Sequence, residues 1–222
     1  MKAKFLNLMA IALTASAITS CGGASSFGKL AMDSPEAVEK VKEITTKNVD
    51  PKEWKLIQVE WSEGTSDSEK LENNLNLGSI FVKLVKPNGQ VFSQGFLGQL
   101  GWKPADISPD HWYSQGLDYE KITPIDASKL DPAAITKQLE EAKAMIPAEY
   151  EFKSLAEYRI EAGVPTSSSG KGEYTSDYRT EFTFNVIEKG NETVSNAGTT
   201  SIVYYEIDFE VASDGTLTMI PQ

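Results

Sequence analysis

Few residues of this chain belong to the types that most often carry catalysis or bind transition metals. Its 222 residues include one histidine, His111, and one cysteine, Cys21. A zinc site takes several Cys or His ligands, and a Ser-His-Asp hydrolase needs a histidine base beside its nucleophile. The Gly-x-Ser-x-Gly turn that carries such a nucleophile in many hydrolases does not occur. The composition therefore predicts a protein that is not an enzyme and that uses no cofactor or transition metal.

Calcium stays open as an alternative, because oxygen ligands suffice for it. Asp67, Glu69 and Glu72 share the polar stretch between Ser62 and Leu77. The Asp-x-Asp-x-Asp-Gly spacing of a calcium loop is missing there, so we expect a solvated, charged loop.

The candidate binding residues are four rings in one short segment. Trp102, His111, Trp112 and Tyr113 alternate there with Asp106 and Asp110. Tryptophan and tyrosine offer a large rigid surface with a polar edge, which suits protein interfaces and carbohydrate stacking. The same rings can instead fill a joint between two packed sheets.

Cys21 ends a largely apolar stretch near the N-terminus. Lys2 and Lys4 come first, residues 5–18 are mainly apolar, and Thr19 and Ser20 directly precede the cysteine. Fourteen residues are fewer than the ~20 of a membrane-spanning helix, and the pattern is typical of a cleaved secretory leader.

The run Ile18-Thr19-Ser20-Cys21, followed by Gly22, resembles the lipobox of bacterial lipoprotein precursors. The resemblance implies a signal peptide at 1–20 and a diacylglycerol on the Cys21 sulfur, which would anchor the mature protein in the outer membrane. Residues 21–33 would then form the lipid-proximal tether. In some Bacteroidota, acidic residues directly after the cysteine mark export to the cell surface. This Bacteroidota-like leader lacks them, which favours a domain that faces the periplasm, with surface exposure as the alternative.

The charge of the chain is strongly negative. It carries 32 acidic and 21 basic residues, a net charge of −11, and removal of residues 1–20 with their two lysines would leave −13. A surface of this sign repels phosphate backbones, so nucleic acid is not an expected partner.

Two stretches carry the signals of an amphipathic helix. Ser34-Pro35 and Asp131-Pro132 each supply an N-cap residue and a proline at the first helical position. Apolar residues follow at helical spacing, and each stretch ends near a proline with an aromatic residue three positions later. The N-cap residues, the lengths of the two stretches and the residues that end them agree so closely that an internal repeat of about 100 residues is expected.

Strand-like stretches follow each predicted helix. Residues 54–61, 78–86 and 91–97 come after the first, and residues 152–161, 179–188, 201–211 and 216–220 come after the second. The turn sequence Pro87-Asn88-Gly89 predicts a hairpin. In residues 201–211, apolar side chains alternate with Glu206, Asp208 and Glu210. Residues 119–125 are expected to form a closing strand.

The predicted fold is therefore α+β, with two tandem repeats at 34–128 and 129–222. Each repeat is one N-terminal helix followed by its own antiparallel sheet of three or four strands, and the first includes the aromatic segment. This element order is similar to that of the PepSY-like and β-lactamase-inhibitor-like domains of exported lipoproteins. That resemblance implies binding of a protein or peptide through an open sheet face or the groove between repeats. The alternative is a glycan-binding lipoprotein of polysaccharide uptake that uses the Trp102 and Trp112 segment.

Overall fold

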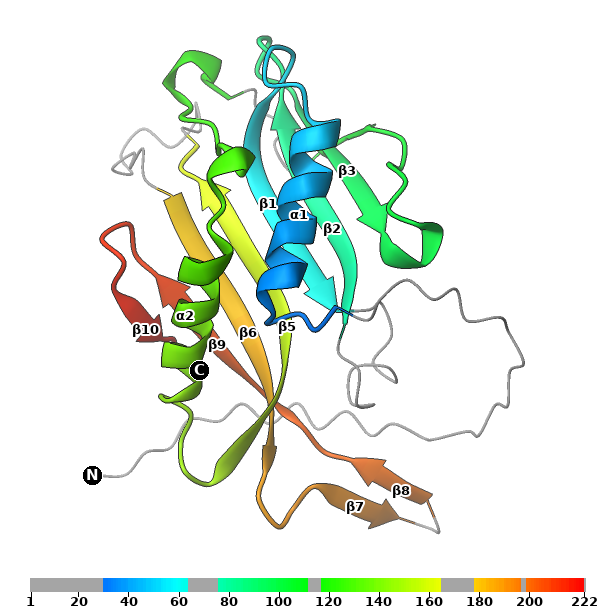
Figure 1. Ribbon diagram of the computed structural model, residues 1–222, viewed down its shortest axis with the longest axis vertical. Coiled ribbons are helices and arrows are strands. Elements are labelled where there is room, and N and C mark those ends of the chain that lie inside the picture. The colour runs from blue at the N-terminus through cyan, green and yellow to red at the C-terminus, as the bar shows by residue number, and fades with distance from the viewer. Residues whose placement is uncertain (1–29, 64–75, 112–116, 165–177, 197–198, 222) are drawn as a thin grey trace.

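In the part of the chain that the computed structural model describes, two α-helices lie side by side over one large antiparallel sheet (Figure 1). The structure describes residues 30–63, 76–111, 117–164, 178–196 and 199–221. The helices are α1 (Pro35–Asn48) and α2 (Pro132–Lys143). The strands are β1 (Lys55–Glu63), β2 (Leu77–Val85), β3 (Val91–Leu97), β4 (Ser108–Pro109), β5 (Tyr150–Ala162), β6 (Tyr178–Glu188), β7 (Thr193–Asn196), β8 (Thr199–Ile202), β9 (Tyr205–Val211) and β10 (Leu217–Met219).

Both helices begin where the sequence predicts. The Ser34 hydroxyl accepts a hydrogen bond from the Ala37 amide, and the Asp131 carboxylate accepts from the amides of Ala133 and Ala134. These side chains satisfy amide groups that the first helical turn leaves without a partner. The apolar stripe of α1, with Val38 and Val41 fully buried, then holds the helix on the sheet.

The expected pair of tandem α+β repeats, each with its own sheet, is wrong. Among the described residues, eight strands form one continuous antiparallel sheet in the order β10-β9-β6-β5-β1-β2-β3-β4. Strands β1 and β5, which the repeats would have placed in separate sheets, pair with Gln58 opposite Glu161 and Trp61 opposite Tyr158. This pairing satisfies the backbone groups of two strands that would otherwise be open edges. The described part of the chain is sheet-dominated, and within it the strands of the two expected repeats share one sheet, so they form no joint between two sheets for the aromatic segment to fill.

A row of aromatic rings crosses the seam between β1 and β5. Trp61, Tyr158, Phe182 and Phe209 occupy facing positions on β1, β5, β6 and β9. Their ring centroids lie 4.4, 5.4 and 5.2 Å apart, and neighbouring planes differ by 20° or less. Stacked pairs of this kind add about 0.5–1.5 kcal/mol each beyond the area they bury. The ladder thus couples strands from both halves of the chain.

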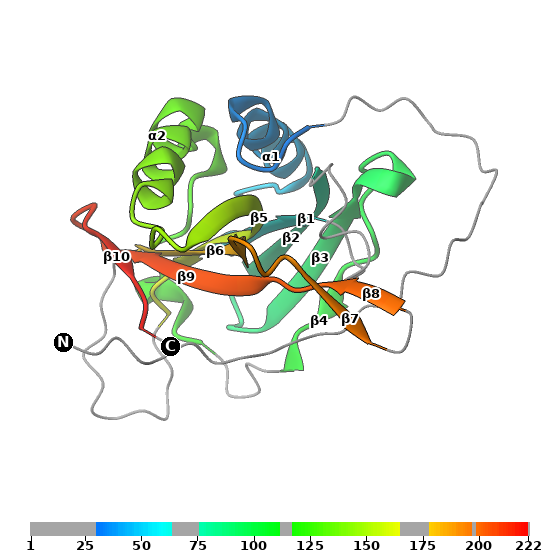
Figure 2. The ribbon, with the colours of Figure 1, turned by 90° about the horizontal axis from the view of Figure 1, so that it is seen from below.

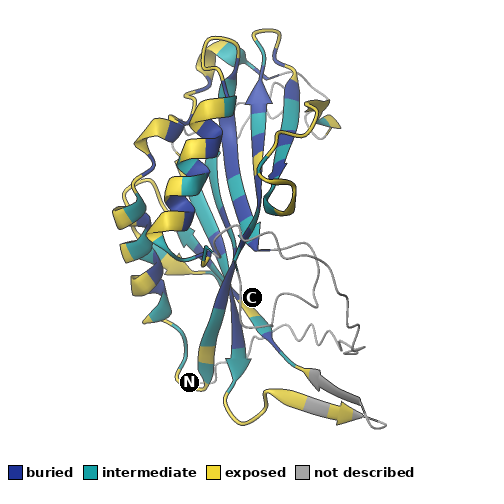
Figure 3. Cartoon of the chain, turned by 45° about the vertical axis from the view of Figure 1, so that its right-hand side comes forward, coloured by how far each residue is buried: buried dark blue, intermediate teal, exposed yellow. Residues whose placement is uncertain are grey.

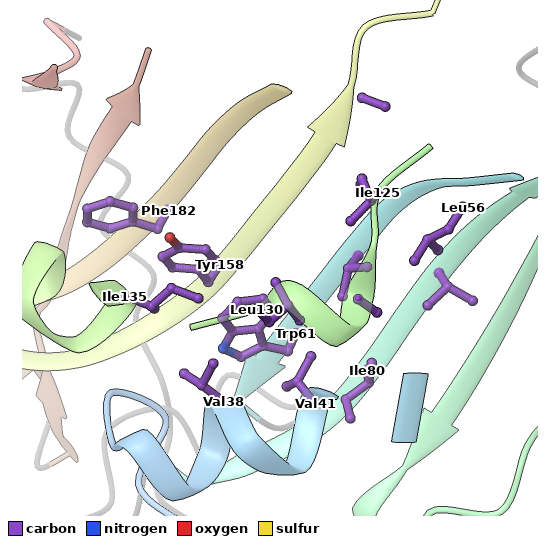
Figure 4. Packing of buried hydrophobic residues seen from close by; sticks show 14 of the residues in the cluster. Val38, Val41, Leu56, Trp61, Ile80, Ile125, Leu130, Ile135, Tyr158 and Phe182 are labelled. Carbon is purple, nitrogen blue, oxygen red and sulfur yellow. The ribbon is translucent and has the colours of Figure 1, made fainter. Parts of the chain in front are cut away.

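The helices cover the ladder from one side. Figure 4 shows Val38 and Val41 of α1 next to Trp61, and Ile135 of α2 next to Tyr158. The Tyr158 hydroxyl donates a 2.6 Å hydrogen bond to Gln138 Oε1 on α2, and burial raises the pKa of this phenol. Seen along the sheet, α1 and α2 both lie above it (Figure 2). Buried residues follow the strands, whereas the exposed residues of both helices face away from them (Figure 3).

Residues 117–130 run along one end of the sheet (Figure 1). Residues 119–125 do not form the expected strand, because Tyr119–Lys121 is a turn of 3-10 helix. The Leu117 amide donates to Gly89, and the Ile125 amide donates to Leu56 O at 2.8 Å, beyond the end of β5. Buried Leu117, Ile122 and Ile125 then carry the chain past β1 toward α2.

A separate two-stranded ribbon completes the described structure. Strands β7 and β8 pair with each other, from Thr193 opposite Ile202 to Asn196 opposite Thr199. The ribbon projects from the far end of β6 and β9 (Figure 1).

Candidate binding site

The face of the sheet opposite the helices is lined by polar and charged side chains. Residues that face each other across antiparallel strands point to the same side, and successive residues of a strand alternate. Because Trp61, Tyr158 and Phe182 point toward the helices, their chain neighbours point away from them. Three consecutive cross-strand rows on β1, β5, β6 and β9 thereby define what we call the acidic face, whose charged members are Glu60, Glu157, Arg159, Glu161, Arg179, Glu181, Asp208 and Glu210.

Two arginines tie these rows together. The Arg159 guanidinium binds the Glu181 carboxylate on the neighbouring strand and lies 3.9 Å from Glu157. Arg179 binds Glu181 as well, and its Nε donates to Glu210 Oε1 at 3.1 Å. Both arginines are thus held by carboxylates on two or more sides.

The surroundings of Glu60 disfavour its anionic form. Burial raises the pKa of its carboxyl, the nearby Arg159 and Lys83 act to lower it, and Glu161 acts to raise it. The Gln58 side-chain amide donates a 2.9 Å hydrogen bond to Glu60 Oε2. The pKa of Glu60 is raised overall, because the cost of burying its charge exceeds the stabilisation that Arg159 and Lys83 provide.

The acidic face carries a formal charge of −4, since its rows hold six carboxylates and two arginines. No group of three or more His, Cys, Asp or Glu side chains within the described residues is arranged to hold a metal ion. The predicted calcium ligands Asp67, Glu69 and Glu72 lie outside those residues. The charge of the acidic face can attract and orient a cationic ligand.

Of the two predicted binding residues that the structure describes, Trp102 has the unusual backbone. It lies just after β3 with φ of +63°, the left-handed region that bulky residues rarely adopt. Gly101 before it is also left-handed at +70°. The Trp102 amide donates to Leu97 O at 3.0 Å, which fixes the bend. The half-buried ring rests on Gly98, where a Cβ atom would come within 3.0 Å of it.

The structure does not bring Trp102 and His111 together. The Trp102 amide bonds to Leu97, the last residue of β3, whereas the Asp110 amide bonds to Val91, the first. Six residues of strand separate these two points by about 20 Å. His111 is exposed, and Trp112, Tyr113 and the predicted lipidation site Cys21 lie outside the described residues.

Sequence reasoning missed the acidic face as a site, although one signal was present. The alternation of Glu206, Asp208 and Glu210 with apolar residues marks a strand with one charged side. The contribution of Glu60, Arg159 and Glu181 depends on which strands are neighbours, and that pairing is not encoded in any local pattern.

Comparison with protein families, with curated proteins and with solved structures finds no match for the chain. Among the described residues, no helix combines the length and apolar character that a membrane crossing requires. The site therefore has to be interpreted from its own geometry and charge.

Proposed function

We propose that this chain is a lipid-anchored, non-enzymatic binding protein of the bacterial cell envelope, which binds a basic protein or peptide segment through the acidic face. The observation that carries the proposal is the asymmetry of the sheet. Both described α-helices occupy one face, and on the opposite face β1, β5, β6 and β9 present six carboxylates and two arginines in three adjacent rows, one of which continues to Lys83 on β2. A segment rich in lysine or arginine complements that charge.

The geometry supports an extended ligand that crosses the strands. The charged side chains run over four neighbouring strands, whose spacing of about 4.8 Å gives a width of roughly 14 Å. Most of these side chains are half-buried, so their rotamers are already restricted. Less side-chain entropy is then lost when a ligand binds.

The test is binding of a ten-residue lysine- and arginine-rich peptide to the full chain, measured by calorimetry at low and high salt. The double variant Glu60→Gln, Glu161→Gln should bind on the order of tenfold more weakly, since each charge pair with the peptide at this half-buried surface contributes about 0.5–1 kcal/mol. The matched control is Glu36→Gln, Glu39→Gln on the exposed side of α1, which should bind as the unchanged chain does. Equal losses in both double variants, or no binding of the peptide at all, would refute the proposal.

The anchor has its own test. In bacteria fed an alkyne analogue of palmitate, the full chain should be labelled and should fractionate with the outer membrane. Cys21→Ala should abolish the label, whereas Cys21→Ala with persistent labelling would rule out lipidation at this residue. Protease treatment of intact cells should leave the domain uncut if it faces the periplasm.

A further inference from the structure

A second candidate site lies on the helix side of the molecule, along α1. A groove of about 1270 Å³ is lined by α1, by the residues just after β3 and by the start of α2. We call it the Trp102 groove. The residues of its lining used below are Glu36, Glu39, Lys40, Glu43, Lys47, Trp102, Lys103 and Asp131. Its volume exceeds the ~300–1000 Å³ of a pocket for a small molecule, so it has room for a short chain of units.

Trp102 is held in this groove against its backbone preference. Its left-handed φ is costly for a bulky residue, yet two hydrogen bonds maintain the bend, from Gly101 to Gly98 O at 2.9 Å and from Trp102 to Leu97 O at 3.0 Å. The ring contacts the α-carbon side of Gly98, so a Cβ atom there would lie 3.0 Å from the indole and push it by a few tenths of an ångström. The bend and the glycine together place one half-exposed indole in the groove wall.

The charges of the lining nearly cancel. Four carboxylates, from Glu36, Glu39, Glu43 and Asp131, are interleaved with the three ammonium groups of Lys40, Lys47 and Lys103. Lys40 and Glu43 form an ion pair of 2.8 Å within the groove. A wall that offers acceptors and donors in similar number, with little net charge, favours an uncharged ligand that has many hydroxyl groups.

A peptide strand is a poorer fit for this place. An extended peptide gains most of its affinity by pairing with an open sheet edge. The outer edge of β3 is already covered, because Phe96 bridges to Pro104, and Phe92 and Ser93 pair with Pro109 and Ser108. The two prolines also lack the amide that a further strand would need.

We propose that the Trp102 groove binds a neutral oligosaccharide. The indole of Trp102 stacks on the apolar face of a sugar ring, and the carboxylates and ammonium groups of α1 exchange hydrogen bonds with the hydroxyls. This site is distinct from the acidic face, so each proposal can fail without the other.

The experiment is calorimetric titration of the full chain with neutral hexasaccharides of β-1,4-glucose, α-1,4-glucose, β-1,4-xylose and β-1,4-mannose. At least one should bind. Trp102→Gly should weaken that binding about tenfold or more, as expected for a central aromatic anchor. Glycine adopts a positive φ without strain, so this variant keeps the bend. Trp102→Phe should retain part of the affinity, and Gly98→Ala should reduce it several-fold by moving the ring.

Two controls assign the binding to the groove. His111→Ala removes a ring at the other end of β3 and should leave sugar affinity unchanged, as should Glu60→Gln on the acidic face. Failure of all four hexasaccharides to bind at millimolar concentration would overturn the proposal. So would unchanged affinity in Trp102→Gly, or a loss in His111→Ala as large as that in Trp102→Gly.

Discussion

Glu60 and Trp102 each occupy a position that disfavours them. Glu60 keeps a carboxylate where burial penalises its charge, and Trp102 keeps a left-handed backbone that a glycine would adopt freely. Costs of this kind commonly occur at functional positions, where a local preference gives way to a requirement of binding. One residue lies on each of the two proposed sites.

Replacing Glu60 with glutamine should stabilise the protein at neutral pH. The folded state raises the pKa of this carboxyl, so between the unfolded and folded pKa values the folded state holds more protons, and stability falls as pH rises through that window. Glutamine keeps the shape and removes the penalised charge. Urea unfolding at pH 4 and pH 7 should show a gain for Glu60→Gln at pH 7 that shrinks at pH 4.

Glu43→Gln should change the stability in the opposite direction to Glu60→Gln. The hydrogen bond and charge of Lys40 lower the pKa of Glu43, so its contribution is present at neutral pH and disappears as pH falls through the lowered value. This variant should be slightly less stable at pH 7 and unchanged at low pH. A loss of stability in Glu60→Gln at pH 7 would contradict the expected sign.

At the scale of elements, the two helices show how much of the secondary structure can be predicted from neighbouring residues in the sequence. A cap residue, a proline and an apolar stripe lie within a few positions of each other, and they predicted the start of both α1 and α2. Alternating side chains and turn glycines likewise identified most strands, including the hairpin at Gly89, where φ is +78°. The short turn at Tyr119–Lys121 was missed because its residues pack against β1 rather than follow a period of their own.

The cap of α2 should be a measurable part of its stability. Asp131→Ala leaves the amides of Ala133 and Ala134 without their side-chain acceptor, at distances now of 3.0 and 3.2 Å. The expected loss is about 1 kcal/mol in the free energy of unfolding. Asp131→Asn, which retains an acceptor oxygen, should lose only a few tenths, and an equal loss in the two variants would argue against the cap.

At the scale of the whole molecule, strand order is what the sequence alone could not supply. The sequence of each strand shows which of its sides is apolar. The residues around Trp61, however, do not indicate that its cross-strand neighbour is Tyr158, nearly 100 residues later. The similar starts of the two helices suggested an internal repeat, and a repeat suggested that each half of the chain forms its own sheet. Pairing of β1 with β5 instead produced one sheet, one aromatic ladder and one charged face. The Trp102 groove likewise depends on residues from both halves of the chain.

The continuous sheet should unfold as a single cooperative unit. Phe182→Ala removes a ring that stacks on both Tyr158 and Phe209 and should cost about 3–5 kcal/mol. Calorimetry of this variant should show one transition at a lower midpoint, because the ladder joins both halves. Two separate transitions, with only one of them shifted, would mean that the halves unfold independently.

The aromatic ladder also gives the molecule a built-in optical probe. The Trp61 ring is fully buried, stacks on Tyr158, and its indole nitrogen has no hydrogen-bond partner among the described residues. An indole in such dry surroundings emits at the short-wavelength end of the tryptophan range and shifts to longer wavelengths once water reaches it. In a variant whose other three tryptophans are replaced by phenylalanine, Trp61 would therefore report, from the centre of the sheet, when the two halves of the sheet separate.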